Sequence, residues 1–174
     1  LVIDELRREE MDLMLFHEHG TPDRQYLTAL PHTRESGEQM EAGRRLFRQA
    51  LRRTGDAEQR EKLKQTWMEL YQVDTLWFAG SDDPIQRVND SLQELRTSIL
   101  LEDVPLISPN ARMVIFDACY NGDFREKRYI AGEYIFTEGK TLVTFANSVN
   151  VLQDKSSTDL LGLLGLGFRV GEWA

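Results

Sequence analysis

Two short apolar segments that both stop at polar residues constrain the fold most strongly. Residues 113–117 (MVIFD) are rich in β-branched and aromatic side chains, which indicates a buried strand. Residues 13–16 (LMLF) form an earlier strand that ends in HEHG. Open α/β sheets place their ligand sites at the carboxyl ends of parallel strands. His19 and Cys119, the only cysteine of the chain, follow these two ends. The pattern therefore indicates a site that combines an imidazole with a thiol.

The segments between the strands have helical periodicity. Strands that alternate with helices imply an α/β fold, in which helices cover both faces of a mostly parallel sheet. We expect three strands, at 12–17, 113–117 and 140–146. We expect a charged helix over 2–10, a helical hairpin over 38–53 and 57–72, an amphipathic helix that runs from Ile85 to Ile99, a short helix over 129–138, and a glycine-rich helix capped by 156–158 that runs to Trp173.

Composition limits the class of protein. A chain of 174 residues with 41% hydrophobic and 29% charged residues predicts one globular domain with a real core. The net charge of -8 argues against a protein that binds nucleic acids or anionic membranes non-specifically. The longest apolar stretch, 160–168, is too short to span a bilayer and is interrupted by glycines. A single cysteine excludes an internal disulfide, and we expect no cofactor.

A run of basic residues marks one side of the helix predicted at 38–53. Arg44, Arg48 and Arg52 recur every four residues and therefore share a face. The run could bind an acidic partner, but the sequence favours a solvated helix face. The aromatic residues Trp67, Trp77 and Phe78 are expected in the core rather than in a ligand platform.

The sequence around Cys119 resembles that of a known family. The segment DACYNGDF at 117–124 is similar to the nucleophile segment of gingipain-type cysteine peptidases, and the CxNGDF run is especially close to the lysine-specific gingipain. The His19-Gly20 pair matches the His-Gly pair of the family. The segment LVTFANSVN at 142–150 resembles the next strand of the family and the loop that walls its specificity pocket. The resemblance covers residues 11–20 and 111–172 and leaves out the stretch between them.

The resemblance implies a mechanism. Cys119 is expected to be the nucleophile and His19 the acid and base that activates it and protonates the leaving amine. The N–H groups of Gly20 and Cys119 are expected to form the oxyanion hole. His17, which points to the same face of the strand as His19, is expected to be a supporting residue. Asn121 to Phe124 are expected to form a turn rather than to take part in catalysis. The sequence leaves open which side of the sheet the side chain of Asp117 faces.

The resemblance also implies a pocket for the side chain before the cleaved bond, the P1 residue. Its expected walls are Ala146, Asn147, Ser148 and Asn150, none of which carries a fixed charge. Gingipains recognise basic P1 residues through an acidic group, and Asp154 is the nearest acid after this segment. A surface position for Asp154 is the favoured alternative. Val151-Leu152 stand where the family has a tryptophan, which weakens the inference of cleavage after arginine or lysine.

For the whole chain, the resemblance implies a caspase-like three-layer α/β/α fold. Residues 1–174 are expected to form a single domain that is the C-terminal part of a catalytic domain, with a helical insertion at 34–80. A caspase-like sheet has more than three strands, so an upstream segment of the same domain is the expected partner that completes it. The other expected partner is a protein or peptide substrate. A secreted or periplasmic bacterial protein is implied by the resemblance alone.

Two alternatives remain open at this point. The first is a catalytically silent relative in which the same fold serves as an interaction domain; the presence of both Cys119 and His19 argues against it. The second is a metal-dependent hydrolase, because His17 and His19 could begin a zinc site. Zinc chemistry needs three or four ligands, and the only other histidine is His32 in a predicted loop. We therefore expect no metal site.

Overall fold

The computed structural model describes residues 2–28, 33–152 and 159–173. The chain divides into two compact units, which are described separately. The first combines residues 1–25 with 100–174, and the second is continuous from Tyr26 to Ile99. The predicted insertion at 34–80 falls inside the second unit, whose bounds are wider. That these residues are part of a longer catalytic domain stays a prediction.

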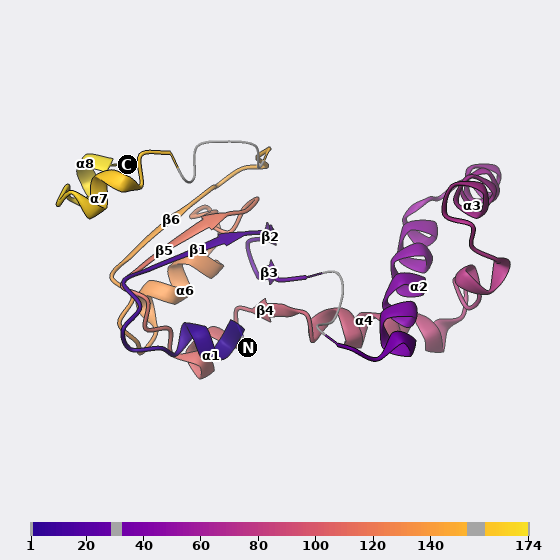
Figure 1. The fold of residues 1–174 in the computed structure, drawn as a ribbon, viewed down its shortest axis with the longest axis horizontal. Coiled ribbons are helices and arrows are strands. Elements are labelled where there is room, and N and C mark those ends of the chain that lie inside the picture. Colours follow the sequence, from indigo (N-terminus) through magenta and orange to yellow (C-terminus); the bar gives the residue numbers. More distant parts are fainter. Residues whose placement is uncertain (1, 29–32, 153–158, 174) are drawn as a thin grey trace. The chain divides into compact units, whose positions relative to one another are not determined.

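A parallel sheet of three strands forms the centre of the first unit (Figure 1). Its order is β1 (Leu13–His17), β5 (Met113–Asp117) and β6 (Val143–Ala146). Both pairings are parallel, and every residue of β5 is buried. The three predicted strands and their parallel arrangement are therefore confirmed, although β6 begins three residues later than expected. The protein belongs to the mixed α/β class.

One helix packs on one face of this sheet, and a short helix contacts the opposite face through an aromatic pair. On one face, the ring of Phe116 stacks on Phe16 and meets Tyr134 of α6 (Ile130–Phe136) edge to face. Side chains alternate along a strand, so Phe145 points to the opposite face. There it contacts Trp173 of α8 (Val170–Trp173). The remaining helices of the unit are short: α1 (Val2–Leu6), α5 (Val104–Ile107) and α7 (Gly162–Gly165).

Two terminal helices differ from the prediction. The N-terminal helix ends at Leu6 rather than near residue 10. The single helix expected up to Trp173 is two short helices, α7 and α8, separated by Gly167 with a φ of +91°. A glycine in the left-handed region ends a helix, which explains the interruption. The capping residues expected at 156–158 lie outside the described residues.

A second, smaller sheet was not predicted. Its order is β2 (His19–Thr21), β3 (Arg24–Tyr26) and β4 (Ser98–Leu100). The helix expected to continue through Ile99 ends at Leu95, and Ile99 lies in β4 with 1% exposure. The hydroxyl groups of Thr97 and Ser98 both donate to the carbonyl oxygen of Glu94. These bonds add to those from the N–H groups of Arg96 and Thr97, so the last turn of the helix closes on the Glu94 carbonyl.

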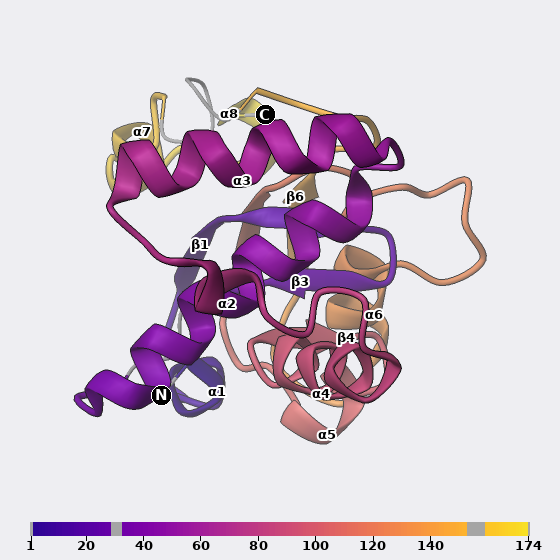
Figure 2. The same cartoon turned by 90° about the vertical axis from the view of Figure 1, so that its right-hand side faces the viewer.

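The second unit is helical between its two strand ends (Figure 2). Phe47 makes ring contacts with four other aromatic side chains, so the aromatic residues pack on one another as predicted, although Phe78 alone among these five is buried. Those four are Trp67, Tyr71, Trp77 and Phe78. Residues 38–72 contain no strand, as predicted. The helices are α2 (Ser36–Arg53), α3 (Ala57–Tyr71), the 3-10 helix η1 (Thr75–Phe78) and α4 (Pro84–Leu95).

The prediction of a solvated arginine face on α2 is wrong for two of its residues. Arg48 is 3% exposed and donates to both oxygens of Asp90, a buried residue of α4. Arg52 donates to the same carboxylate at 2.8 Å. Burial of a carboxylate is tolerated only when it is paired and hydrogen-bonded, so Asp90 directs the polar side of α4 inward. The predicted amphipathic pattern is present, but its apolar residues Ile85 and Val88 are exposed.

Candidate functional site

The ends of β1 and β5 lie level with each other. His17 is the register partner of Asp117, and the N–H of Glu18 donates to the carbonyl oxygen of Asp117. His19 and Cys119 therefore each follow a paired position by two residues, at the same edge of the sheet. This register brings the two strand ends to the same edge of the sheet, as the sequence predicted.

The two histidines differ in their partners. Nδ1 of His17 lies 2.6 Å from Oδ2 of Asp117, whose side chain is 8% exposed. The side chain of His19 is exposed and makes no hydrogen bond or ion pair within the described residues. Asp117, whose direction was left open by the sequence, therefore orients His17. His19 keeps an imidazole that is free to meet a ligand.

The thiol of Cys119 lies against the segment that follows β6. Its S–H donates to Oδ1 of Asn150 at 2.8 Å, and the N–H of Val151 donates to the sulfur at 3.4 Å. The thiol is partly exposed. The prediction that the residues after Ala146 emerge beside the thiol is confirmed as a matter of geometry. Their role in binding a substrate stays a prediction.

The turn after Cys119 packs against residues 146–149, at the end of β6 and just beyond it. Tyr120 has a φ of 56°, a left-handed conformation that costs a non-glycine residue roughly 1–2 kcal/mol. Its N–H donates to the carbonyl oxygen of Val149, and the N–H of Gly122 donates to that of Asn147. A Cβ on Gly122 would lie 2.8 Å from atoms of Ala146, so glycine is needed there. No backbone acceptor for the Cys119 N–H lies within the described residues.

An ion pair borders the predicted P1 pocket. Arg125 donates to both carboxylate oxygens of the buried Asp123 and to the carbonyl oxygen of Ser148. The hydrogen bond from Arg125 lowers the pKa of Asp123 below its usual value. The pair adds no net charge beside Ser148. No sequence pattern predicts this contact, because the run from Asn121 to Phe124 indicates only a turn.

A buried polar chain lies behind the histidines. Glu18 is 8% exposed and accepts a hydrogen bond of 2.6 Å from Nε2 of Gln25, whose Oε1 accepts from the hydroxyl of Tyr134. Burial raises the pKa of Glu18 to about 7, against a smaller opposite effect of the Gln25 bond. Glu18 therefore gains or loses its proton near neutral pH. No sequence signal separates it from an ordinary exposed glutamate.

Two predicted residues cannot be compared with the structure. Asp154 and His32 lie outside the described residues. Within the described part of the chain, no group of three or more His, Cys, Asp or Glu side chains could hold a metal ion. In the same part, no helix has the length and apolar character needed to cross a membrane.

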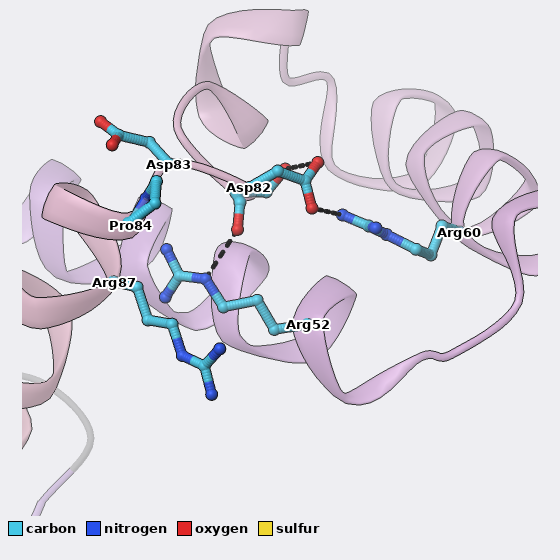
Figure 3. A pocket seen from close by; sticks show the side chains of 7 residues that line it. Arg52, Arg60, Asp82, Asp83, Pro84 and Arg87 are labelled. Atoms are coloured by element: carbon cyan, nitrogen blue, oxygen red, sulfur yellow. Dashed lines mark hydrogen bonds and ion pairs between the residues drawn. The ribbon is translucent and has the colours of Figure 1, made fainter.

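The second unit contains a cavity of about 280 Å³ that holds none of the predicted site residues (Figure 3). Three arginines and two aspartates line it. Arg52 is engaged by Asp90 and by the carbonyl oxygens of Gly80 and Ser81, and Arg60 pairs with Asp82. Most of the positive charge is therefore satisfied within the unit.

Comparison with known proteins identified no similar protein. No protein-family model, no curated protein and no solved structure matches the chain.

Proposed function

We propose that the chain is part of a cysteine endopeptidase in which Cys119 is the nucleophile and His19 is the acid and base. The observation that carries the proposal is the register of β1 and β5, with His17 opposite Asp117. It sets His19-Gly20 and Cys119 at the same edge of the sheet. Two segments that resemble one peptidase family thus follow adjacent strands of one parallel sheet.

The chemistry follows from these positions. The sulfur of Cys119 attacks the carbonyl carbon of the peptide bond, and the thiol proton passes to His19. His19 gives this proton to the leaving amine as the acyl-enzyme forms. Water then attacks the thioester, giving its proton to His19 and releasing the acid and the free thiol. The N–H groups of Gly20 and Cys119 stabilise the oxyanion of each tetrahedral intermediate.

The finer fold is part of the same proposal. The three-stranded sheet with helices on both faces is compatible with a caspase-like three-layer α/β/α architecture. In that fold the sheet is completed by further strands, which an upstream segment of the same domain supplies. A protein or peptide substrate would lie across the edge that carries Cys119.

The specificity pocket is proposed at Ala146, Asn147, Ser148 and Asn150. The support is the contact between the thiol and Asn150, since the side chain before the cleaved bond must pass close to the attacking sulfur. Cleavage after lysine or arginine needs an uncompensated acid at the pocket. Asp123 is neutralised by Arg125, so that role falls to Asp154.

Hydrolysis of fluorogenic peptides with varied P1 residues tests the proposal. Cys119→Ala should abolish cleavage, because no other thiol is present in the chain. The circular dichroism spectrum of the variant should match that of the wild type. Full activity in Cys119→Ala would falsify the peptidase assignment.

A second candidate function is an interaction domain without catalysis. The observation that favours it is the hydrogen bond from the thiol to Asn150, which occupies the S–H group with a partner other than histidine. Measuring peptide binding and product release side by side separates the two functions. A silent domain would bind peptides equally well before and after Cys119→Ala and would release no product.

A further inference from the structure

The side chain of Asn121 joins the loop that follows Cys119 to the hairpin loop of β2 and β3, whose first strand begins at His19. Asn121 is completely buried. Its Nδ2 donates to the carbonyl oxygen of Thr21 at 2.6 Å and to that of Arg24 at 2.9 Å. Both N–H groups of the amide are therefore used on a segment about a hundred residues away in the sequence.

The close approach of the Asn121 amide leaves no room for a side chain at Gly20. A Cβ on Gly20 would lie 2.5 Å from Oδ1 of Asn121, well inside van der Waals contact. The absence of a side chain at position 20 lets the amide approach the backbone beside His19. The glycine of the His-Gly pair and the asparagine of the Cys loop thus fit each other directly.

Turn formation does not explain these bonds. An asparagine that forms an Asn-Gly turn bonds to its own backbone within two residues. The amide of Asn121 instead bonds to the other loop, and its buried Oδ1 accepts no hydrogen bond. An unsatisfied buried acceptor costs about 1–3 kcal/mol. A buried amide with that cost indicates a role in holding the two loops together.

We propose that Asn121 is the positioning residue that fixes His19-Gly20 relative to Cys119. This inference rests on the proposed function of Cys119 and His19. Asn121 does not touch the reacting atoms; it acts through the backbone at Thr21 and Arg24. Without it the two loops have fewer bonds to each other, and a misplacement of about 1 Å can cost on the order of 10²-fold in rate.

The test is the pH dependence of Cys119 alkylation by iodoacetamide, in which the sulfur displaces iodide. In the wild type, His19 beside the thiol should add an inflection to the profile that His19→Ala removes. Asn121→Ala should remove or shift the same inflection while Cys119 is still alkylated at high pH. Its kcat on a peptide should fall about 100-fold.

Two further variants sharpen the test. Gly20→Ala keeps the amide of Asn121 but displaces it, so the inflection should change in this variant too, even if Asn121→Ala does not fold. Asn110→Ala is the matched control, because Nδ2 of Asn110 also bonds a distant carbonyl, that of Arg7, but before β5 rather than after it. Its profile should match the wild type.

The outcomes separate the two proposals. If the inflection is lost in His19→Ala but kept in both Asn121→Ala and Gly20→Ala, the positioning role of Asn121 is overturned and the peptidase pair stands. If His19→Ala leaves the wild-type profile unchanged, the pairing of His19 with Cys119 is itself wrong.

Discussion

Neighbouring residues with the same chemistry have different surroundings at this site. His17 and His19 are separated by one residue, yet among the described residues a carboxylate partner is present for His17 and not for His19. The bond to Asp117 fixes the orientation of the His17 ring, whereas the exposed imidazole of His19 has no partner within the described residues and can turn toward a substrate. This difference gives the first prediction.

His19→Ala should lower kcat by about 10²–10⁴-fold, the usual contribution of a general acid and base. His17→Ala should lower it much less. Steady-state hydrolysis of a fluorogenic peptide measures both. A larger loss in His17→Ala would transfer the catalytic role to the histidine paired with Asp117.

The bond between the thiol and Asn150 predicts a change in thiol reactivity. Asn150→Ala removes an acceptor from the S–H group, and a hydrogen bond of this kind is worth about 1 kcal/mol. Alkylation of Cys119 at neutral pH should therefore become about fivefold faster. Ser148→Ala, in the same segment, should change the rate little. Equal rates in all three proteins would contradict a restraint by Asn150.

Glu18 predicts how stability depends on pH. Because its pKa is raised to about 7 in the folded state, the folded protein binds more protons than the unfolded chain between the ordinary value of 4.5 and 7. The free energy of unfolding should therefore fall as pH rises through this window. At pH 8, Glu18→Gln should be more stable than the wild type by up to about 3 kcal/mol.

Urea denaturation at pH 5 and pH 8 measures this effect. The exposed Glu10→Gln is the matched control and should leave the pH dependence unchanged. If Glu18→Gln retains the wild-type fall in stability between the two pH values, burial of a protonated Glu18 is not its source.

At the scale of elements, the buried contact between α2 and α4 centres on one carboxylate, and Gln49 adds a hydrogen bond to Glu94 beside it. Asp90 accepts hydrogen bonds from Arg48, Arg52 and Gln86, and this burial sets which side of α4 faces inward. Burial is the largest single effect and raises the pKa of Asp90, but the hydrogen bonds from Arg48, Gln86 and Arg52 together hold that pKa below its usual value.

Asp90→Ala should destabilise the protein by roughly 3–5 kcal/mol, because it leaves buried guanidinium groups without their shared partner. Asp82→Ala removes an ion pair with Arg60 from a side chain that is 72% exposed, and its effect should be far smaller. Chemical denaturation compares the two. Equal, small losses of stability would show that Asp90 does not hold α4 in place.

Sequence patterns predicted where helices and strands occur better than they predicted which side of a helix packs inward. The spacing of Ile85, Val88 and Leu92 correctly indicates a helix, but it cannot tell which side packs. That choice depends on Asp90 meeting two arginines from a helix some forty residues earlier. The same long-range pairing explains why Arg48 was wrongly expected in solvent.

At the scale of the whole molecule, the central sheet could be predicted because its strands are continuous apolar runs. The strands β2, β3 and β4 have three residues each, which is too short for a periodic pattern, and β4 pairs with β3, a strand far from it in the sequence. The strand ends that carry His19 and Cys119 follow from the parallel sheet. The contacts of Asn121, Glu18 and Arg125 do not, because ordinary polar residues acquire them only when the loops meet.

The most direct test of the central claim is labelling with peptidyl acyloxymethyl ketones, followed by intact-protein and peptide mass spectrometry. The sulfur of Cys119 should displace the carboxylate and form one thioether, and the label should be absent in Cys119→Ala and strongly slowed in His19→Ala. The P1 residues that label fastest would define the pocket. Failure of the wild-type protein to form this adduct with any P1 residue, with Cys119 still open to iodoacetamide, would contradict a cysteine peptidase built on Cys119 and His19.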